Sequence, residues 1–248
     1  MLDNLAAPQK SAVPMVFERH EQKYVMDRST YQQLLKNLGD QIRMDQYGKQ
    51  TISSLYYDTE DYMFARRQLD NSKYREKLRL RAYGDPVDHH QPAFVELKKK
   101  VNGITYKRRV TLPYNQAHRY LASRSGSISR NDDMNAREID RFTHSHELSR
   151  QTAVIYERTA YSTADGLRLT FDENIRWRSR NVNLINHNQG IPLLASGMVV
   201  MEIKLPRALP FEWSQLFASL KLYPQPFSKY GLIYKYGIQG GQQCLSVI

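Results

Sequence analysis

Basic residues occupy every second position of the stretch KYREKLRLR, which covers residues 73–81. The cations are Lys73, Arg75, Lys77, Arg79 and Arg81. Alternate side chains of a β-strand point to opposite faces, so this spacing predicts one strand face lined with positive charge. Arginine can bind phosphate through two parallel hydrogen bonds. The stretch therefore indicates a site for a phosphate-rich anion.

Charged residues alternate in the same way along several other predicted strands. Their cations are Lys23, Lys98, Lys100, Lys107, Arg109, Arg158 and Lys204. One interpretation is that these residues lie on the solvent-exposed faces of half-buried sheets, because such sheets usually alternate buried and solvated side chains. A solvent-exposed face normally carries both positive and negative side chains, however, and here cations predominate. We therefore favour a shared charged interior, in which a polyanion would relieve the repulsion between like charges.

Three carboxylates, Glu21, Glu96 and Glu202, each stand two residues before a lysine. Within a strand the two side chains of such a pair point to the same face. One interpretation is that each carboxylate holds its lysine in an ion pair. The alternative is that the carboxylates bind Mn²⁺ or Mg²⁺, hard cations that bridge carboxylates and phosphate oxygens. The spacing leaves both interpretations open.

The elements that would carry these residues are mostly short strands joined by hairpins. Asn102-Gly103 and Asp165-Gly166 are strong turn signals, because these residues tolerate positive φ. Ser29 and Thr59 are the expected N-caps of two helices. The predicted strands cover residues 16–26, 51–58, 74–83, 93–101, 105–112, 152–163, 167–176 and 197–205, and the predicted helices cover 30–38, 60–69, 113–122 and 210–220. This pattern predicts an α+β fold, an eight-stranded antiparallel β-barrel tunnel with flanking helices.

Composition limits the class of protein and its compartment. The formal net charge of +11 favours an anionic partner. Cys244 is the only cysteine, which excludes an intramolecular disulfide and fits a reducing, cytoplasmic location. Residues 1–15 lack the apolar segment of a signal peptide and are expected to be a disordered leader. We expect residues 16–248 to form a single domain, with a polar insertion at about 123–150.

The sequence lacks the motifs of other common nucleotide-binding and hydrolytic sites. We find no Gly-rich Walker loop, no GxGxxG turn and no nucleophile elbow. We do not expect nucleic acid as a partner, although the chain has 17 tyrosines. In residues 74–83, apolar Leu78 and Leu80 separate the tyrosines, so no platform for stacking bases is indicated.

Eight short motifs, taken in order, resemble those of one family. They are RHEQKY (19–24), SLYYDT (54–59), RLRAYG (79–84), FVELK (94–98), KRR (107–109), YER (156–158), MEIK (201–204) and SKY (228–230). The pattern resembles the VTC domain, the catalytic domain of polyphosphate polymerase, in the triphosphate tunnel metalloenzyme (CYTH-like) superfamily. The resemblance extends from about residue 17 to 236.

The resemblance implies a tunnel in which ATP donates its γ-phosphate to a growing polyphosphate chain, with a divalent metal. Glu202 would be the metal ligand. The residues that hold phosphate would be Lys23, Arg79, Arg81, Lys98, Arg158 and Lys229, with Lys204 nearby. The alternating faces alone add Lys107 and Arg109 as further phosphate ligands, and Glu21 and Glu96 as further metal ligands. Of these, Arg79, Arg81, Lys98 and Glu202 are the expected catalytic residues.

Two alternatives stay open beside the polymerase. If water is the acceptor, the protein is a metal-dependent inorganic triphosphatase or polyphosphatase; without turnover it is a polyphosphate-binding module. We see neither an SPX regulatory domain nor a transmembrane region, so the chain resembles a stand-alone bacterial type. The preferred metal, the oligomeric state and a membrane-protein partner stay open.

Overall fold

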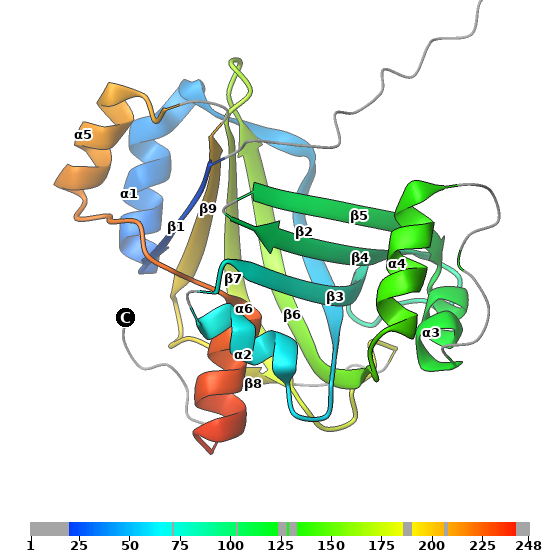
Figure 1. Cartoon of the computed structure of the whole chain (residues 1–248). Coiled ribbons are helices and arrows are strands. Elements are labelled where there is room, and N and C mark those ends of the chain that lie inside the picture. The colour runs from blue at the N-terminus through cyan, green and yellow to red at the C-terminus, as the bar shows by residue number, and fades with distance from the viewer. Residues whose placement is uncertain are drawn as a thin grey trace, which may run out of the picture.

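The computed structural model describes residues 20–70, 72–102, 104–123, 128, 133–185, 190–205 and 208–241. It contains one large antiparallel sheet with helices on its outer side (Figure 1). The expected leader at 1–15, Gly103 and Cys244 lie outside the described residues. No helix in the described part of the chain is long and apolar enough to cross a membrane.

The sheet has nine strands, eight of which correspond to the predicted ones. Their order across the sheet is β1-β9-β7-β6-β2-β3-β4-β5, and the short β8 pairs with β7. Every pairing is antiparallel, as predicted. The strands are β1 (His20–Met26), β2 (Arg43–Asp58), β3 (Tyr74–Tyr83), β4 (Pro92–Val101), β5 (Ile104–Pro113), β6 (Ser149–Ser162), β7 (Arg168–Arg178), β8 (Ile191–Pro192) and β9 (Val199–Leu205).

The prediction of a closed barrel is wrong. Among the described residues no strand pairing joins the two edge strands, β1 and β5. The chain that precedes the last helices occupies part of the β1 edge instead: the backbone N–H of Gln225 donates to the carbonyl of Lys23, and the Lys23 ammonium donates to the carbonyl of Phe227. In the described part of the chain, no backbone ladder therefore joins the two ends of the curved sheet.

The predicted alternation of faces is confirmed in β3. Leu78 and Leu80 are fully buried in the core on one face, while Lys77, Arg79 and Arg81 line a cavity on the other. Lys73 does not belong to this row, because it precedes the strand and is exposed. The periodicity of two thus separates core from cavity along the strand.

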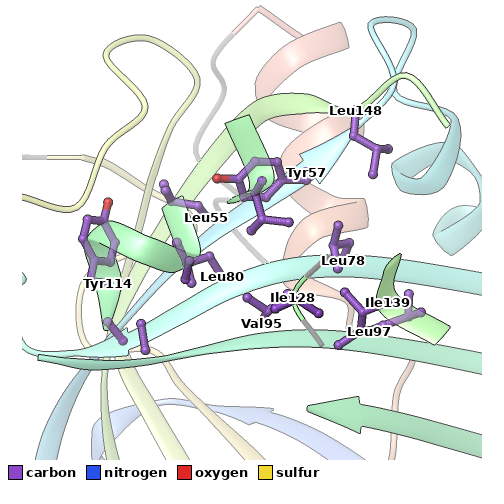
Figure 2. Close-up of a cluster of buried hydrophobic side chains, with 14 of the residues drawn as sticks. Leu55, Tyr57, Leu78, Leu80, Val95, Leu97, Tyr114, Ile128, Ile139 and Leu148 are labelled. Carbon is purple, nitrogen blue, oxygen red and sulfur yellow. The ribbon is translucent and has the colours of Figure 1, made fainter. Parts of the chain in front are cut away.

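The helices pack against the sheet in three groups (Figure 1). Near β1 and β9 lie α1 (Arg28–Leu38) and α5 (Phe211–Ser219). Near β3 and β4 lie α3 (Tyr114–Ser123) and α4 (Met134–His144), over a core that includes Leu55, Leu97 and Ile139 (Figure 2). The third group is α2 (Met63–Leu69) with α6 (Lys229–Leu232), which packs on the inner face, where Tyr230 stacks on Tyr56. A short 3-10 helix, Gly39–Gln41, follows α1, and a π-helix, Ile233–Gln239, follows α6.

Local capping differs from the sequence-based expectation at two helices. The side chain of Asp27, not Ser29, caps α1, because it accepts from the Thr30 N–H at 2.7 Å. The helix α2 begins at Met63 rather than at residue 60. Thr59 still contributes, since its hydroxyl accepts from the Met63 N–H at 3.0 Å.

The predicted polar insertion contains α4, which packs on the sheet. Ala136, Ile139 and Phe142 are buried on its inner side. Glu138 accepts from Arg108 of β5 and lies 3.0 Å from the Lys99 ammonium of β4. Apolar burial and ion pairs therefore both attach this helix to the outer face of the sheet.

Candidate functional site

A cavity of about 720 Å³ lies on the inner face of the sheet. Every residue that the sequence assigned to the site lines it: Glu21, Lys23, Arg79, Arg81, Glu96, Lys98, Lys107, Arg109, Arg158, Glu202, Lys204 and Lys229. With Lys77, the lining holds ten cationic side chains but only three carboxylates. The excess of positive charge marks the cavity as a site for a polyanion.

One buried carboxylate organises the cations at the β5 side of the cavity. Glu96 is 1% exposed, and its oxygens lie 2.8 Å from Arg79 Nε and 2.8 Å from the Lys107 ammonium. Arg109 donates to the same carboxylate, and Arg81 Nε lies 3.8 Å away. Burial would raise the pKa of Glu96, but these four cations hold it well below its usual range. Both oxygens of Glu96 are therefore engaged by protein cations.

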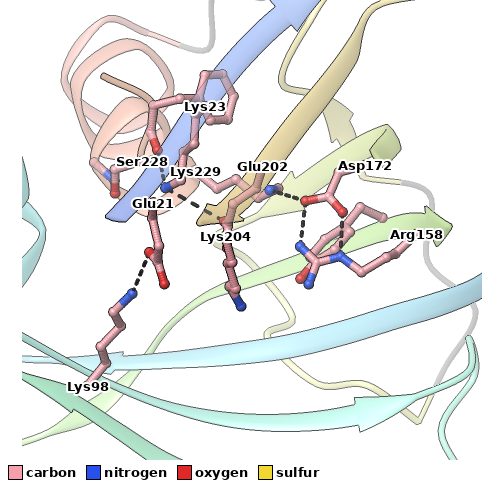
Figure 3. A network of polar contacts seen from close by, with 12 residues as sticks. Glu21, Lys23, Lys98, Arg158, Asp172, Glu202, Lys204, Ser228 and Lys229 are labelled. Atoms are coloured by element: carbon pink, nitrogen blue, oxygen red, sulfur yellow. Dashed lines mark hydrogen bonds and ion pairs between the residues drawn. The ribbon is translucent and has the colours of Figure 1, made fainter. Parts of the chain in front are cut away.

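A second buried carboxylate, Asp172 of β7, organises the opposite wall (Figure 3). Arg158 donates to its two oxygens at 2.6 and 2.8 Å, in a bidentate pair. Lys229 of α6 donates to the same group. Asp172 is 1% exposed, and the two cations outweigh burial and lower its pKa. The pair positions Arg158 and Lys229 side by side.

The remaining carboxylates, Glu21 and Glu202, are less tightly engaged (Figure 3). The Glu202 oxygens lie 4.0 Å from the Lys23 ammonium and 3.4 Å from the Lys204 ammonium. Burial opposes ionisation, but Lys23 and Lys204 outweigh it and lower the pKa of Glu202, so the side chain is an anion. Glu21 accepts from Lys98 at 3.0 Å and links β1 to β4.

The pKa values of two lysines in the cavity, Lys77 and Lys107, are lowered. Lys77 is half-buried and, within the described chain, has neither a hydrogen bond nor an ion pair of its own. Burial and the neighbouring Lys98 and Lys23 hold its pKa well below the ordinary value. Burial also lowers the pKa of Lys107, from 10.5 to about 8, even though Glu96 opposes the shift. A bound anion would favour the charged form of both lysines and offset the repulsion between neighbouring cations.

Tyrosines form the inner end of the cavity. The hydroxyl of buried Tyr156 accepts from Arg81 Nη2 at 3.0 Å, and its ring packs against the Lys229 ammonium, 4.7 Å from the ring centroid. Burial raises the pKa of Tyr156, but Arg158 and Arg81 outweigh it and keep the pKa below its ordinary value. The hydrogen bond that it accepts orients Arg81.

A series of contacts that starts at Asp58 holds the helix α6 at the cavity. This buried carboxylate accepts from the backbone N–H groups of Phe64 and Ala65 at 2.9 Å, at the start of α2. It also accepts from the Tyr230 hydroxyl at 2.8 Å. The Tyr230 ring stacks on Tyr56, with centroids 4.5 Å apart. Asp58 thereby fixes the helix that carries Lys229.

The sequence model of the VTC domain family matches residues 18–236 of the chain. The chain belongs to the VTC domain family. This result confirms the resemblance drawn from the eight motifs, each of which has residues on or next to the cavity. A search of curated protein sequences finds no match.

Two solved structures share the fold of this VTC domain. One is a candidate adenylate cyclase from Bacillus halodurans, with a TM-score of 0.53 and 14% identity over 87% of this chain and 96% of that chain. The other is a candidate adenylyl cyclase from Hippeastrum, described as having a dominant triphosphatase activity, with a TM-score of 0.52 and 13% identity over 88% of this chain and 96% of that chain. Likeness at these identities shows the fold alone.

Sequence reasoning missed three groups of this VTC site. Asp172 alternates with Thr170 on β7 and could have been assigned from that spacing. Lys77 was part of the predicted charged face but was not assigned a role. Tyr230 and the helix that carries it were missed because residues 221–241 show no clear helical periodicity.

Proposed function

We propose that this VTC domain is a metal-dependent phosphotransferase that moves the γ-phosphate of ATP onto a polyphosphate chain. The observation that carries the proposal is the cavity lined by ten cations and three carboxylates. Phosphoryl transfer needs positioning and charge stabilisation more than covalent chemistry from the protein. A cation-lined cavity without a protein nucleophile meets that need.

The two cation groups would hold different parts of the substrate. Arg79 and Arg81, ordered by Glu96 and Tyr156, would bind and orient the β- and γ-phosphates together with Lys98. Arg158 and Lys229, ordered by Asp172, would bind phosphate from the opposite wall. Lys23, Lys107, Arg109 and Lys204 would neutralise further phosphate charge. Because carboxylates already fix the arginines, little rearrangement is needed when the anion binds.

Glu202 and Glu21 are the residues that would hold Mn²⁺ or Mg²⁺. Both line the cavity and their charges interact. Within the described residues no group of three His, Cys, Asp or Glu side chains could hold a metal ion. Mg²⁺ is usually bound by one or two carboxylates plus substrate phosphates, so this donor set fits. The bound ion would neutralise charge on the phosphate oxygens. Glu96, whose oxygens are engaged by four cations, would order arginines instead.

Hydrolysis is the second candidate activity, with water as the acceptor. The β5 side of the cavity is open to solvent, since the side chains of Lys107 and Arg109 are 45% and 38% exposed. Water can therefore reach the phosphates there. The triphosphatase activity described for the Hippeastrum protein of this fold is consistent with that possibility.

The test is to incubate the purified protein with γ-labelled ATP, Mn²⁺ or Mg²⁺ and a short polyphosphate primer, and to separate the products on a gel. A ladder of lengthening phosphate supports the polymerase. Release of orthophosphate alone would replace it with a triphosphatase. Absence of turnover, with tripolyphosphate still raising the melting temperature, would leave a binding module. Arg81→Ala and Lys98→Ala should abolish turnover, whereas Lys36→Ala, at an exposed residue of α1 that does not line the cavity, should not.

A further inference from the structure

The cation-lined face of β3, β4 and β5 ends in aromatic residues on one side. Phe94 of β4 is the cross-strand partner of Arg81, and Tyr83 is the next residue of β3 on the same face. In the opposite direction the face carries cations and a threonine but no aromatic ring, in the rows Lys77, Lys98, Lys107 and then Arg75, Lys100, Thr105. The two ends of this face therefore offer different chemistry to a ligand.

Tyr83, Phe94 and Arg109 lie against one another at the aromatic end, and we call them the aromatic cluster. The guanidinium carbon of Arg109 lies 4.6 Å from the centroid of the Phe94 ring, in a cation–π contact. The Tyr83 ring meets Phe94 edge-on, with centroids 5.9 Å apart and an interplanar angle of 85°. Arg109 Nε also donates to Glu96 at 2.8 Å. The Phe94 ring and the Glu96 carboxylate together fix the position of the guanidinium.

The aromatic cluster is accessible to solvent. Tyr83 is 37% exposed, Phe94 is half-buried, and the side chain of Arg109 is 38% exposed. Among the described residues no further strand pairs beyond β5, so Arg109 lies at an open edge of the sheet. A planar ligand can therefore reach the aromatic cluster from this edge. The tyrosines that line the cavity itself are buried and less accessible: Tyr56, Tyr156 and Tyr230.

We propose that the aromatic cluster binds the nucleobase of a nucleoside triphosphate whose phosphates lie among the cations of the cavity. The inference rests on the proposed function, because it takes the cavity to hold the phosphates of ATP. Bases stack on aromatic rings and on arginine guanidinium groups. The strands β3 and β5 lie about 10 Å apart, so a ribose and an α-phosphate can connect a base on Arg109 with phosphates on Arg79 and Arg81.

The contacts of Arg109 favour a base over a direct phosphate ligand. Bidentate binding of phosphate uses the N–H groups at the edge of a guanidinium, and Nε and Nη2 of Arg109 already donate to Glu96. Stacking uses the flat face of the group instead, and its charge would still attract the phosphates. Binding of a nucleic-acid strand relies on successive rings that stack successive bases. One aromatic cluster suits the single base of a mononucleotide.

The test compares the calorimetric affinities of the full chain for ATP, UTP and tripolyphosphate, without divalent metal so that turnover is avoided. The wild type should bind ATP more tightly than UTP, because the larger purine ring stacks more strongly. Phe94→Leu keeps an apolar side chain but removes the aromatic face. It should weaken ATP binding about tenfold and tripolyphosphate binding much less, because tripolyphosphate has no base. Arg109→Lys keeps the charge but not the flat guanidinium, and it should abolish the difference between ATP and UTP.

Phe211→Leu, the same substitution at a 71% exposed residue of α5, is the matched control and should bind all three ligands as the wild type does. Equal losses of ATP and tripolyphosphate affinity in Phe94→Leu would overturn the inference, because Phe94 would then only position Arg109. An unchanged ATP affinity in Phe94→Leu would overturn it as well, and both results leave the proposed function intact. Failure of the wild type to bind tripolyphosphate would overturn the proposed function. Tighter binding of a single-stranded oligonucleotide than of ATP would overturn the choice of a mononucleotide.

Discussion

Single buried carboxylates set the position of several cations at once in this molecule. Glu96 contacts Arg79, Arg109 and Lys107, and Asp172 contacts Arg158 and Lys229. A buried charge is tolerated when it is paired and hydrogen-bonded. The intact pair contributes little net free energy of folding, but removing one partner is strongly destabilising. The cations of the site therefore depend on carboxylates that need not touch the substrate.

The variant Glu96→Gln tests this role. It leaves several cations close together without their shared anion, so we expect the free energy of unfolding to fall by about 3 kcal/mol. We expect sulfate or phosphate to raise the melting temperature of the variant more than that of the wild type. Differential scanning calorimetry with and without sulfate measures both effects.

Glu21→Gln is the control for that experiment, because Glu21 makes one partly exposed ion pair and should contribute at most about 1 kcal/mol. A Glu96→Gln protein as stable as the wild type, with a lost response to Mn²⁺ or Mg²⁺, would identify Glu96 as a metal ligand instead.

The lowered pKa of Lys107, about 8, predicts how binding depends on pH. Above pH 8 the side chain loses its proton and its attraction for phosphate, so tripolyphosphate should bind more weakly as the pH rises from 7.5 to 9.5. One linked proton changes the dissociation constant by at most about tenfold per pH unit. Lys107→Arg keeps its charge and should flatten the profile. The same profile in both proteins would contradict the assignment.

Through Lys107, a rise in pH has the opposite effect on the stability of the free protein: it weakens anion binding but raises the free energy of unfolding. The unfolded chain, with a lysine pKa near 10.4, binds more protons than the folded one between about pH 8 and 10.4. The contribution of Lys107 to the free energy of unfolding therefore rises with pH in that window. In Lys107→Arg this rise should be absent from urea unfolding curves.

At the scale of elements, α6 completes a site that is otherwise built from strands. It is only Lys229–Leu232, too short to be stable alone, and it is held by contacts with α2. Ser228 caps it, and its Tyr230 donates to Asp58. The position of Lys229 thus depends on Asp58, the last residue of β2, which also binds the start of α2.

The variant Asp58→Asn should weaken tripolyphosphate binding although Asp58 does not line the cavity. The new amide N–H₂ group would face either the Phe64 N–H, or the Ala65 N–H together with the Tyr230 hydroxyl, leaving a buried polar group poorly paired at a cost of about 1–3 kcal/mol. Calorimetric titration measures the affinity. Asp61→Asn, at an exposed ion pair with Arg66, is the control and should bind normally. Normal binding by a destabilised Asp58→Asn protein would show that Lys229 is positioned independently.

At the scale of the whole molecule, the sheet is curved but open between β1 and β5. Glu21 and Lys98 form one side-chain link across the cavity. Lys23 and Lys204 lie on the β1 side, and Lys107 and Arg109 on the β5 side. An anion that contacts both groups would bridge the edges of the sheet.

Hydrogen–deuterium exchange should reveal that bridging. Tripolyphosphate should slow amide exchange in β1 and β5, because opening the edges would break contacts with the anion. The helix α5, which packs on the outer face, serves as the internal control and should change little. Protection that is equal in α5 and in the edge strands would indicate general stabilisation rather than bridging.

The sequence by itself determined which side chains share a face. Alternation along a strand is local, so the positions of Arg79, Arg81, Lys98 and Glu96 on the cavity side followed from a period of two. The turn at Asp165-Gly166 was predictable for the same reason, and Gly166 has a φ of +85°. The family also followed from short motifs whose order along the chain is a property of the sequence.

Only the tertiary structure decided how these faces meet. The segment that ends at Phe227 contacts the β1 edge, so the sheet stays open where a closed barrel was predicted. The pairing of Asp172 with Arg158 lies within one hairpin, but it is joined by Lys229, which comes from α6 far along the chain. Such contacts depend on long-range packing, which local periodicity does not encode. The sequence therefore determined the charges, and the fold decided which carboxylate each cation contacts.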